Sequence, residues 1–197
     1  MSGPLKGIRV LDLTRHIPGP FTTHLLTRLG ATVIKVEAEN AGSYDVLRIF
    51  PPYVKYSGPK DNEHSARDST AIFEALNVGK KGLSLDVKSD KGRETLMKMA
   101  KNIDVVVDSS QRGLMQKLQL DYASFSKVNP RIIYCNISGF GVSGDPAYAN
   151  RPTHDLNLMA LSGLLDVSGP NIPGHAPPTI GFPAAAITGS LNAVIGT

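Results

Sequence analysis

Residues 153–156 read Thr-His-Asp-Leu and place a titratable imidazole directly beside a carboxylate. A histidine near neutral pH can act as a general acid or base, and a carboxylate can share that work. His154 follows a segment rich in glycine and proline and precedes an apolar stretch with helical spacing, and such junctions face clefts in α/β folds. A lone histidine at a helix start is more often structural than catalytic, and Asp155 could simply cap the helix.

The other side chains that could take part in a reaction or bind a metal form no recognisable motif. The five histidines, at positions 16, 24, 64, 154 and 175, lack metal-ligand spacing, so no metal site is predicted. Cys135 lies in the apolar run IIYCNI, which favours a buried small side chain over a nucleophile that would use His154 as its base. Residues 77–81 place two lysines in a glycine-containing turn, which suits either solvent exposure or contact with a phosphate.

The elements that must position these groups begin with a βαβ unit. A strand is expected at 7–13, a helix at 21–31 that ends near Gly30, and a strand at 32–38. Further strands are expected at 82–87, 104–108 and 131–137, and helices at 89–102, 112–118, 121–129, 154–165 and 184–197. Residues 39–70 are polar and are expected to form a long loop. The predicted fold is α/β, with a Rossmann-like parallel sheet flanked by helices.

A dinucleotide-binding function is disfavoured although the chain has a βαβ pattern. The turn after the first strand reads LTRHIPGP and lacks the G-x-G-x-x-G sequence that lets a backbone approach a pyrophosphate. Glu37 ends the second strand where an acid could bind a ribose, but this single feature is weak.

Composition excludes several other classes. The chain has 197 residues, of which 41% are hydrophobic, as in a globular domain. Its 21 basic and 17 acidic residues give a mild charge of +4 without clusters, so no nucleic-acid partner is predicted. No apolar run approaches the roughly 18 residues of a membrane span. No targeting segment is visible, and a single cysteine is typical of a reducing compartment.

Six stretches, in this order, resemble the class III CoA-transferase family, and within it the α-methylacyl-CoA racemases. They are PLKGIRVLDLT, IPGPFTTHLLTRLGATVIKVE, LNVGKKGLSLDVKSDKG, RGLMQKLQL, NPRIIYCNISGFGVSG and HDLNLMALSGLL, and together they cover nearly all of the chain except 39–70. The fourth and sixth stretches favour the racemase branch, whereas the length of segment 39–76 is more similar to the transferase branch.

The resemblance implies a Rossmann-like large domain that binds CoA thioesters, a smaller domain and a dimer of interlaced chains. Because family members are much longer, residues 1–197 are expected to be the N-terminal part of an incomplete large domain, without the small domain. Its Rossmann-like core would span about 5–138, and the His-Asp helix with the helix after it would span 153–197. The resemblance therefore implies an oligomeric or complex-bound protein that needs a partner chain to complete its fold, in a mitochondrial or cytoplasmic setting.

The resemblance also implies a ligand site for coenzyme A. The residues carried over to it are His16, Ile17, Lys35, Asn77, Lys80, Lys81 and Arg112. Ala38 and Gln111 stand where the family commonly has arginines, and Arg112 is shifted by one position. Losing such charge-assisted phosphate contacts weakens binding, so we expect only weak binding of a CoA thioester and no tightly bound cofactor.

His154 falls on the racemase histidine, and Asp155 on the acid beside it. The catalytic aspartate of the family is expected at Ala185, and the flanking Ala184 and Ala186 are also alanine. A methyl group can neither accept a proton nor attack a thioester. Two interpretations follow: a non-catalytic homologue kept as a structural or accessory subunit, or an acyl-CoA racemase or CoA-transferase that works through His154.

Overall fold

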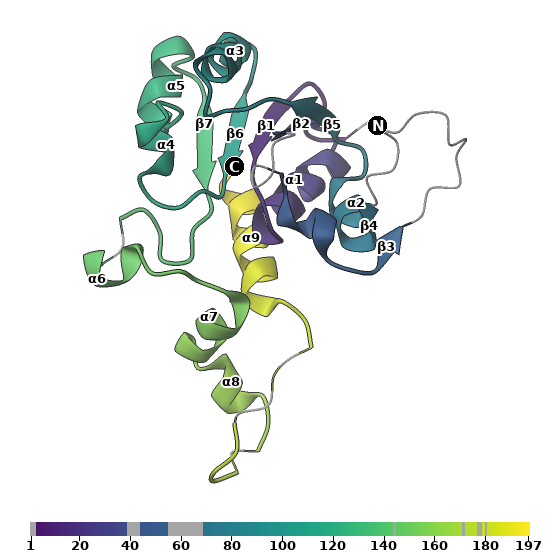
Figure 1. Cartoon of the computed structure of the whole chain (residues 1–197), viewed down its shortest axis with the longest axis vertical. Helices are drawn as coiled ribbons and strands as arrows, with labels where there is room; N and C mark the ends of the chain where they lie inside the picture. The colour runs from purple at the N-terminus through teal and green to yellow at the C-terminus, as the bar shows by residue number, and fades with distance from the viewer. Residues whose placement is uncertain are drawn as a thin grey trace.

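Five parallel strands form the central sheet of the computed structural model, which describes residues 3–38, 44–54, 69–143, 145–170, 172–176, 179 and 181–197 (Figure 1). In chain order they are β1 (Arg9–Leu13), β2 (Thr32–Glu37), β5 (Lys81–Ser84), β6 (Val105–Asp108) and β7 (Ile133–Asn136). Their spatial order is β5-β2-β1-β6-β7, with every neighbouring pair parallel. The predicted Rossmann-like sheet is therefore confirmed.

Helices of the described residues cover both faces of this sheet, and others lie beside it or away from it (Figure 1). They are α1 (Pro18–Arg28), α2 (Ala71–Asn77), α3 (Asp90–Ala100), α4 (Leu114–Lys117), α5 (Tyr122–Val128), α6 (Pro146–Ala149), α7 (Asp155–Leu161), α8 (Leu164–Val167) and α9 (Ala184–Gly196). α3 and α5 cover one face and α1 the other. Three helices begin where a side chain satisfies a free backbone N–H: Thr70 caps α2, Ser89 caps α3 and Asp121 caps α5.

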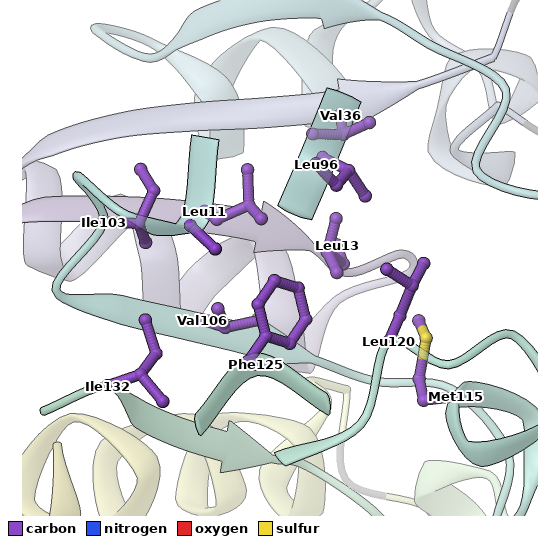
Figure 2. Packing of buried hydrophobic residues seen from close by; sticks show 11 residues of the cluster. Leu11, Leu13, Val36, Leu96, Ile103, Val106, Met115, Leu120, Phe125 and Ile132 are labelled. Carbon is purple, nitrogen blue, oxygen red and sulfur yellow. The ribbon is translucent and has the colours of Figure 1, made fainter. Parts of the chain in front are cut away.

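Side chains that alternate along the strands supply a core on each face of the sheet. Leu11 and Val106 join the cluster under α3 and α5, which contains the fully buried Phe125 (Figure 2). Val10 instead packs on the opposite face with Leu26 of α1. Because both faces are covered, the central strands β1 and β6 are mostly apolar, which explains why the sequence predicts their positions.

The expectation of a plain loop over 39–70 is wrong for the part that the structure describes. Residues Val46–Ile49 form a short 3₁₀ helix, η1, and β3 (Tyr53–Val54) pairs antiparallel with β4 (Ser69–Thr70). Asp45 caps η1 by accepting a hydrogen bond from the Leu47 N–H. Residues 39–43 and 55–68 lie outside the described residues.

The single helix expected over 154–165 is also wrong. α7 ends at Leu161 and α8 starts at Leu164, because Gly163 between them has a φ of 79°. That left-handed conformation suits glycine and interrupts a right-handed helix. Figure 1 shows α7 and α8 away from the sheet, with α9 running from them back toward it. α9 packs against both α1 and α7 and so links the two regions.

No helix in the described ranges is long and apolar enough to cross a membrane.

Candidate functional site

The strand order reverses between β1 and β6, and ligands of open α/β sheets bind at such a reversal, outside the carboxyl ends of the strands. The turns that follow these two strands are joined there, since the Arg15 N–H donates to Ser109 Oγ at 3.0 Å. His16 and Arg112, both exposed, come from these two turns. The structure thus brings these two predicted ligand residues to the edge where a ligand is expected.

The turn after β1 is held from beneath by buried side chains. Asp12 Oδ1 accepts hydrogen bonds from both the N–H and the hydroxyl of Thr14, at 3.0 and 2.5 Å. His16 adopts a left-handed backbone with a φ of 64°, and its N–H donates to Asp45 Oδ1 at 3.1 Å. Ile17 follows at the N-cap position of α1 and makes no side-chain cap hydrogen bond there. A left-handed residue with a Cβ is strained, and such strain is typically found at functional positions.

Lys35 and Lys80 lie in internal ion pairs. Lys35 Nζ is 3.0 Å from Asp45 Oδ2, and Lys80 Nζ is 3.1 Å from Asp12 Oδ2. All four side chains are at most 3% exposed. Lys35 Nζ already has two protein acceptors and Lys80 Nζ has four, so this arrangement does not favour contacts of these two residues with the phosphates of CoA.

Burial and charge together set the ionisation of the Asp12–Lys80 pair. Burial alone raises the pKa of Asp12. The nearby ammonium groups of Lys35 and Lys80 and two hydroxyl donors together lower it by more, so the pKa lies below its ordinary value. Burial lowers the pKa of Lys80 to about 8, against the attraction of Asp12. Both groups therefore carry charge at neutral pH.

The other predicted ligand residues on this side have different roles. Asn77 Oδ1 accepts a hydrogen bond from Lys80 Nζ at 2.8 Å, so it stabilises the buried cluster. Lys81 is exposed at the start of β5, the edge strand. It therefore lies on the sheet away from the order reversal between β1 and β6.

The negative charge of Glu37 is paired with Arg48, a residue that the sequence analysis did not identify. Arg48 Nε and Nη2 donate to the two carboxylate oxygens of Glu37 at 3.0 and 2.7 Å. The Arg48 guanidinium also lies 3.7 Å from the centre of the Phe73 ring. Burial raises the pKa of Glu37, but the hydrogen bonds from Arg48 and the Asp45 N–H, together with the charges of Arg48 and Lys35, lower the pKa overall. Glu37 is thus engaged as an ion-pair partner within the protein.

His154 and Asp155 lie at the second predicted site, at the start of α7. His154 lines a cleft of about 560 Å³ with apolar walls from Leu156, Ala160 and Leu165. Asp155 lines a neighbouring cleft of about 310 Å³ beside Pro183. Among the described residues, no acidic side chain forms an ion pair with the His154 imidazole.

The Asp155 carboxylate is directed to the start of α9. Its Oδ1 accepts a hydrogen bond from the Ala186 N–H at 2.8 Å. A carboxylate in this position stabilises a helix N-terminus. Asp155 therefore joins α7 to α9, in addition to its place in the first turn of its own helix, and its side chain already has a structural partner.

The three alanines at the start of α9 have different surroundings. Ala184 is buried with Met159 and Leu165, and Ala185 packs against the same apolar cluster. Ala186 is four residues before Ser190 and so shares its face of the helix. Ser190 Oγ lies 2.7 Å from the Pro18 carbonyl oxygen, which places that face toward the start of α1. Of the three, Ala186 is the position where a carboxylate would face the first turn of α1.

Comparison with known proteins decides the family, since a model of CoA-transferase family III matches residues 5–197. The chain belongs to CoA-transferase family III. A CAIB/BAIF family protein from Brucella suis has the same fold, with a TM-score of 0.86 and 34% identity over 100% of this chain and 48% of its own.

Members of CoA-transferase family III with different activities are similar to this chain to nearly the same degree. A succinyl-CoA:mesaconate CoA-transferase of Haloarcula hispanica is 35% identical over 98% of this chain and 46% of its own length. Human α-methylacyl-CoA racemase is 34% identical over 84% of this chain and 35% of its own. These identities do not separate the two branches. The chain spans about half or less of the length of these relatives.

The sequence pattern missed the residues that shape the turn after β1. Asp12 carried a usable signal, because a lone carboxylate within the apolar strand 7–13 needs a buried partner. Asp45 carried none, because it lies in a polar segment where an acidic residue is unremarkable. Ser109 likewise acquires its role only through contact with a turn 94 residues away.

Proposed function

We propose that this chain is a CoA-transferase family III homologue that has lost acyl transfer and racemisation and serves as a structural or accessory subunit. The observation that carries the proposal is the start of α9, where Ala184, Ala185 and Ala186 occupy every position available to the expected carboxylate. No alignment choice among the three restores an acid.

The neighbouring acid does not replace the missing group. Asp155 is the nearest acid along the chain to His154, and its Oδ1 is bound to the Ala186 N–H. In the proposed reaction of active members, two proton-handling groups act on opposite faces of the α-carbon. His154 and Asp155 line different clefts, with Leu156 bordering both. This arrangement supports separate surroundings for the two side chains over a shared substrate carbon.

A second candidate function is an active racemase or transferase that works through His154. The observation that favours it is the position of His154 on the wall of an apolar cleft large enough for an acyl chain. Replacing His154 by alanine distinguishes the two candidate functions. An active enzyme loses its turnover in the variant, whereas an inactive subunit shows no turnover either before or after the change. A turnover that His154→Ala abolishes would establish the second candidate.

We expect weak binding of CoA thioesters. Ala38 is buried and Gln111 is neutral, so the two arginine contacts common in the family are absent. Two lost charge-assisted contacts, at about 1.5–3 kcal/mol each, correspond to roughly 10²- to 10⁴-fold in affinity. Titration calorimetry with acetyl-CoA is expected to give no sub-micromolar dissociation constant. The variant Gln111→Arg should bind more tightly than the unchanged protein, and sub-micromolar binding by the latter would contradict the expectation.

A partner that completes the fold is part of the same proposal. Apolar side chains stand exposed on α9 and α8, with Ile195 84% and Val167 78% exposed. Exposed aliphatic side chains on an otherwise packed domain favour association. Purification of the native protein from its source, in a mitochondrial or cytoplasmic fraction, should yield a stoichiometric complex with a second chain. Recovery as a free monomer would contradict this expectation.

A further inference from the structure

We propose that Asp45 is a positioning residue which, paired with Lys35, holds the turn 14–16 in its left-handed shape for ligand binding. This inference rests on the proposed binding of CoA thioesters at the carboxyl edge of the sheet. It changes the role of Lys35 from a predicted phosphate contact to one half of an internal clamp, and gives Asp45 a role that the sequence pattern did not suggest.

The clamp holds both a donor and an acceptor of the turn backbone. Asp45 Oδ1 accepts from the His16 N–H at 3.1 Å, and Lys35 Nζ donates to the Thr14 carbonyl oxygen at 3.0 Å. The two side chains are joined to each other through Asp45 Oδ2 at 3.0 Å. Because residues 14 and 16 are the ends of the turn, the first two bonds fix its backbone from both ends, and the third joins the two side chains that make them.

The clamp is itself fixed in place. Asp45 Oδ1 also accepts from the Leu47 N–H, and the Asp45 N–H donates to Glu37 Oε1, each at 3.1 Å. Asp45 is fully buried and Lys35 is 3% exposed. Lys35 lies in β2, next to β1, so a rigid strand carries one half of the clamp.

The free-energy costs of the clamp indicate that it serves to position the turn and not to stabilise the fold. A buried ion pair loses its hydration, and apolar side chains of similar size often stabilise a fold as well or better. His16 adds an unfavourable left-handed backbone that a side chain with a Cβ rarely adopts. Both costs are incurred around the turn that follows β1, and that turn lies at the order reversal of the sheet. A turn held this firmly presents the exposed His16 side chain outward in a fixed direction.

A mutant cycle tests whether Asp45 acts through the backbone of residue 16. His16→Gly and His16→Ala both remove the imidazole, but glycine adopts a positive φ without strain whereas alanine does not. We expect Asp45→Ala to weaken acetyl-CoA binding by at least about tenfold in the His16→Ala protein, measured by calorimetry. The same change should have a smaller effect in the His16→Gly protein. Equal effects in the two backgrounds would overturn the positioning role.

Amide hydrogen exchange of the ligand-free protein gives a readout that does not depend on CoA. Asp45→Ala should speed exchange at the amides of residues 14–16, and Asp45→Asn, which keeps an acceptor oxygen, should speed it less. Asp90→Ala on the exposed start of α3 is the matched control and should leave those amides unchanged. Unaltered exchange in Asp45→Ala would overturn the clamp. If the unaltered protein binds no acetyl-CoA, the proposed ligand is refuted. The hydrogen-exchange measurement still tests whether Asp45 and Lys35 hold the turn.

Discussion

In deuterated buffer, a 2-methylacyl-CoA incubated with this protein is expected to keep its α-hydrogen. In the reaction expected of active members, proton-handling groups act on both faces of the α-carbon, and the start of α9, where the second group is expected, offers only the methyl groups of Ala184, Ala185 and Ala186. Enzymes typically turn over about 1–10³ times per second, so an active site would label the substrate within minutes. Mass spectrometry of the recovered thioester measures the label.

Two aspartate substitutions make this expectation position-specific. Ala186→Asp places a carboxylate on the face of α9 that is directed toward α1, and we expect it to raise labelling above that of the unchanged protein. Ala184→Asp places the same group among Met159 and Leu165, where burial of an unpaired charge destabilises the fold without creating a site. Rapid labelling by the unchanged protein, lost in His154→Ala, would show that the site is active after all.

Loss of the buried Asp12 carboxylate is expected to cause the largest change in stability. Asp12→Ala removes the partner of Lys80 and the acceptor of the Thr14 and Thr23 hydroxyls. Breaking one half of a buried ion pair costs about 3–5 kcal/mol, because the remaining charge stays buried without compensation. The difference between variant and unchanged protein in the free energy of unfolding, measured by urea denaturation, should fall in this range.

The control for this prediction is a carboxylate of the same type in an exposed pair. Asp90 pairs with Arg93 on the surface of α3 and is 90% exposed, so Asp90→Ala should cost about 1 kcal/mol or less. Replacing Lys80 by methionine in the Asp12→Ala protein should recover part of the lost stability, because it removes the stranded ammonium. Similar losses for the Asp12 and Asp90 variants would contradict the assigned role of the buried pair.

The elements that the sequence predicts well are those with a strong local pattern. The strand around Val106 is a continuous apolar run and is buried on both faces, as expected for a central parallel strand. The elements it predicts poorly depend on single residues or distant contacts. Gly163 divides the helix expected over 154–165. α2 begins after its cap, Thr70, which lies at the end of the segment that the sequence predicts to be a polar loop.

The candidate site likewise has one part that the sequence predicts and another that depends on the packing of the fold. The sequence identifies the histidine and the row of alanines, because residue identity alone shows that a methyl group cannot handle a proton. The sequence cannot tell which alanine faces α1, since that depends on how α9 packs against its neighbours. It also predicts Lys35 and Lys80 as ligand residues, and only the structure shows that each has a buried carboxylate partner.

The sequence by itself therefore determined the family, the parallel sheet and the absence of a carboxylate at the start of α9. Only the tertiary structure decided which charges serve the fold, through the pairs Lys35–Asp45 and Lys80–Asp12, and which turn they hold. The physical reason is that periodicity and residue chemistry are local properties, readable along the chain. The partner of a buried charge is a property of the folded packing, because it joins residues that lie far apart in sequence.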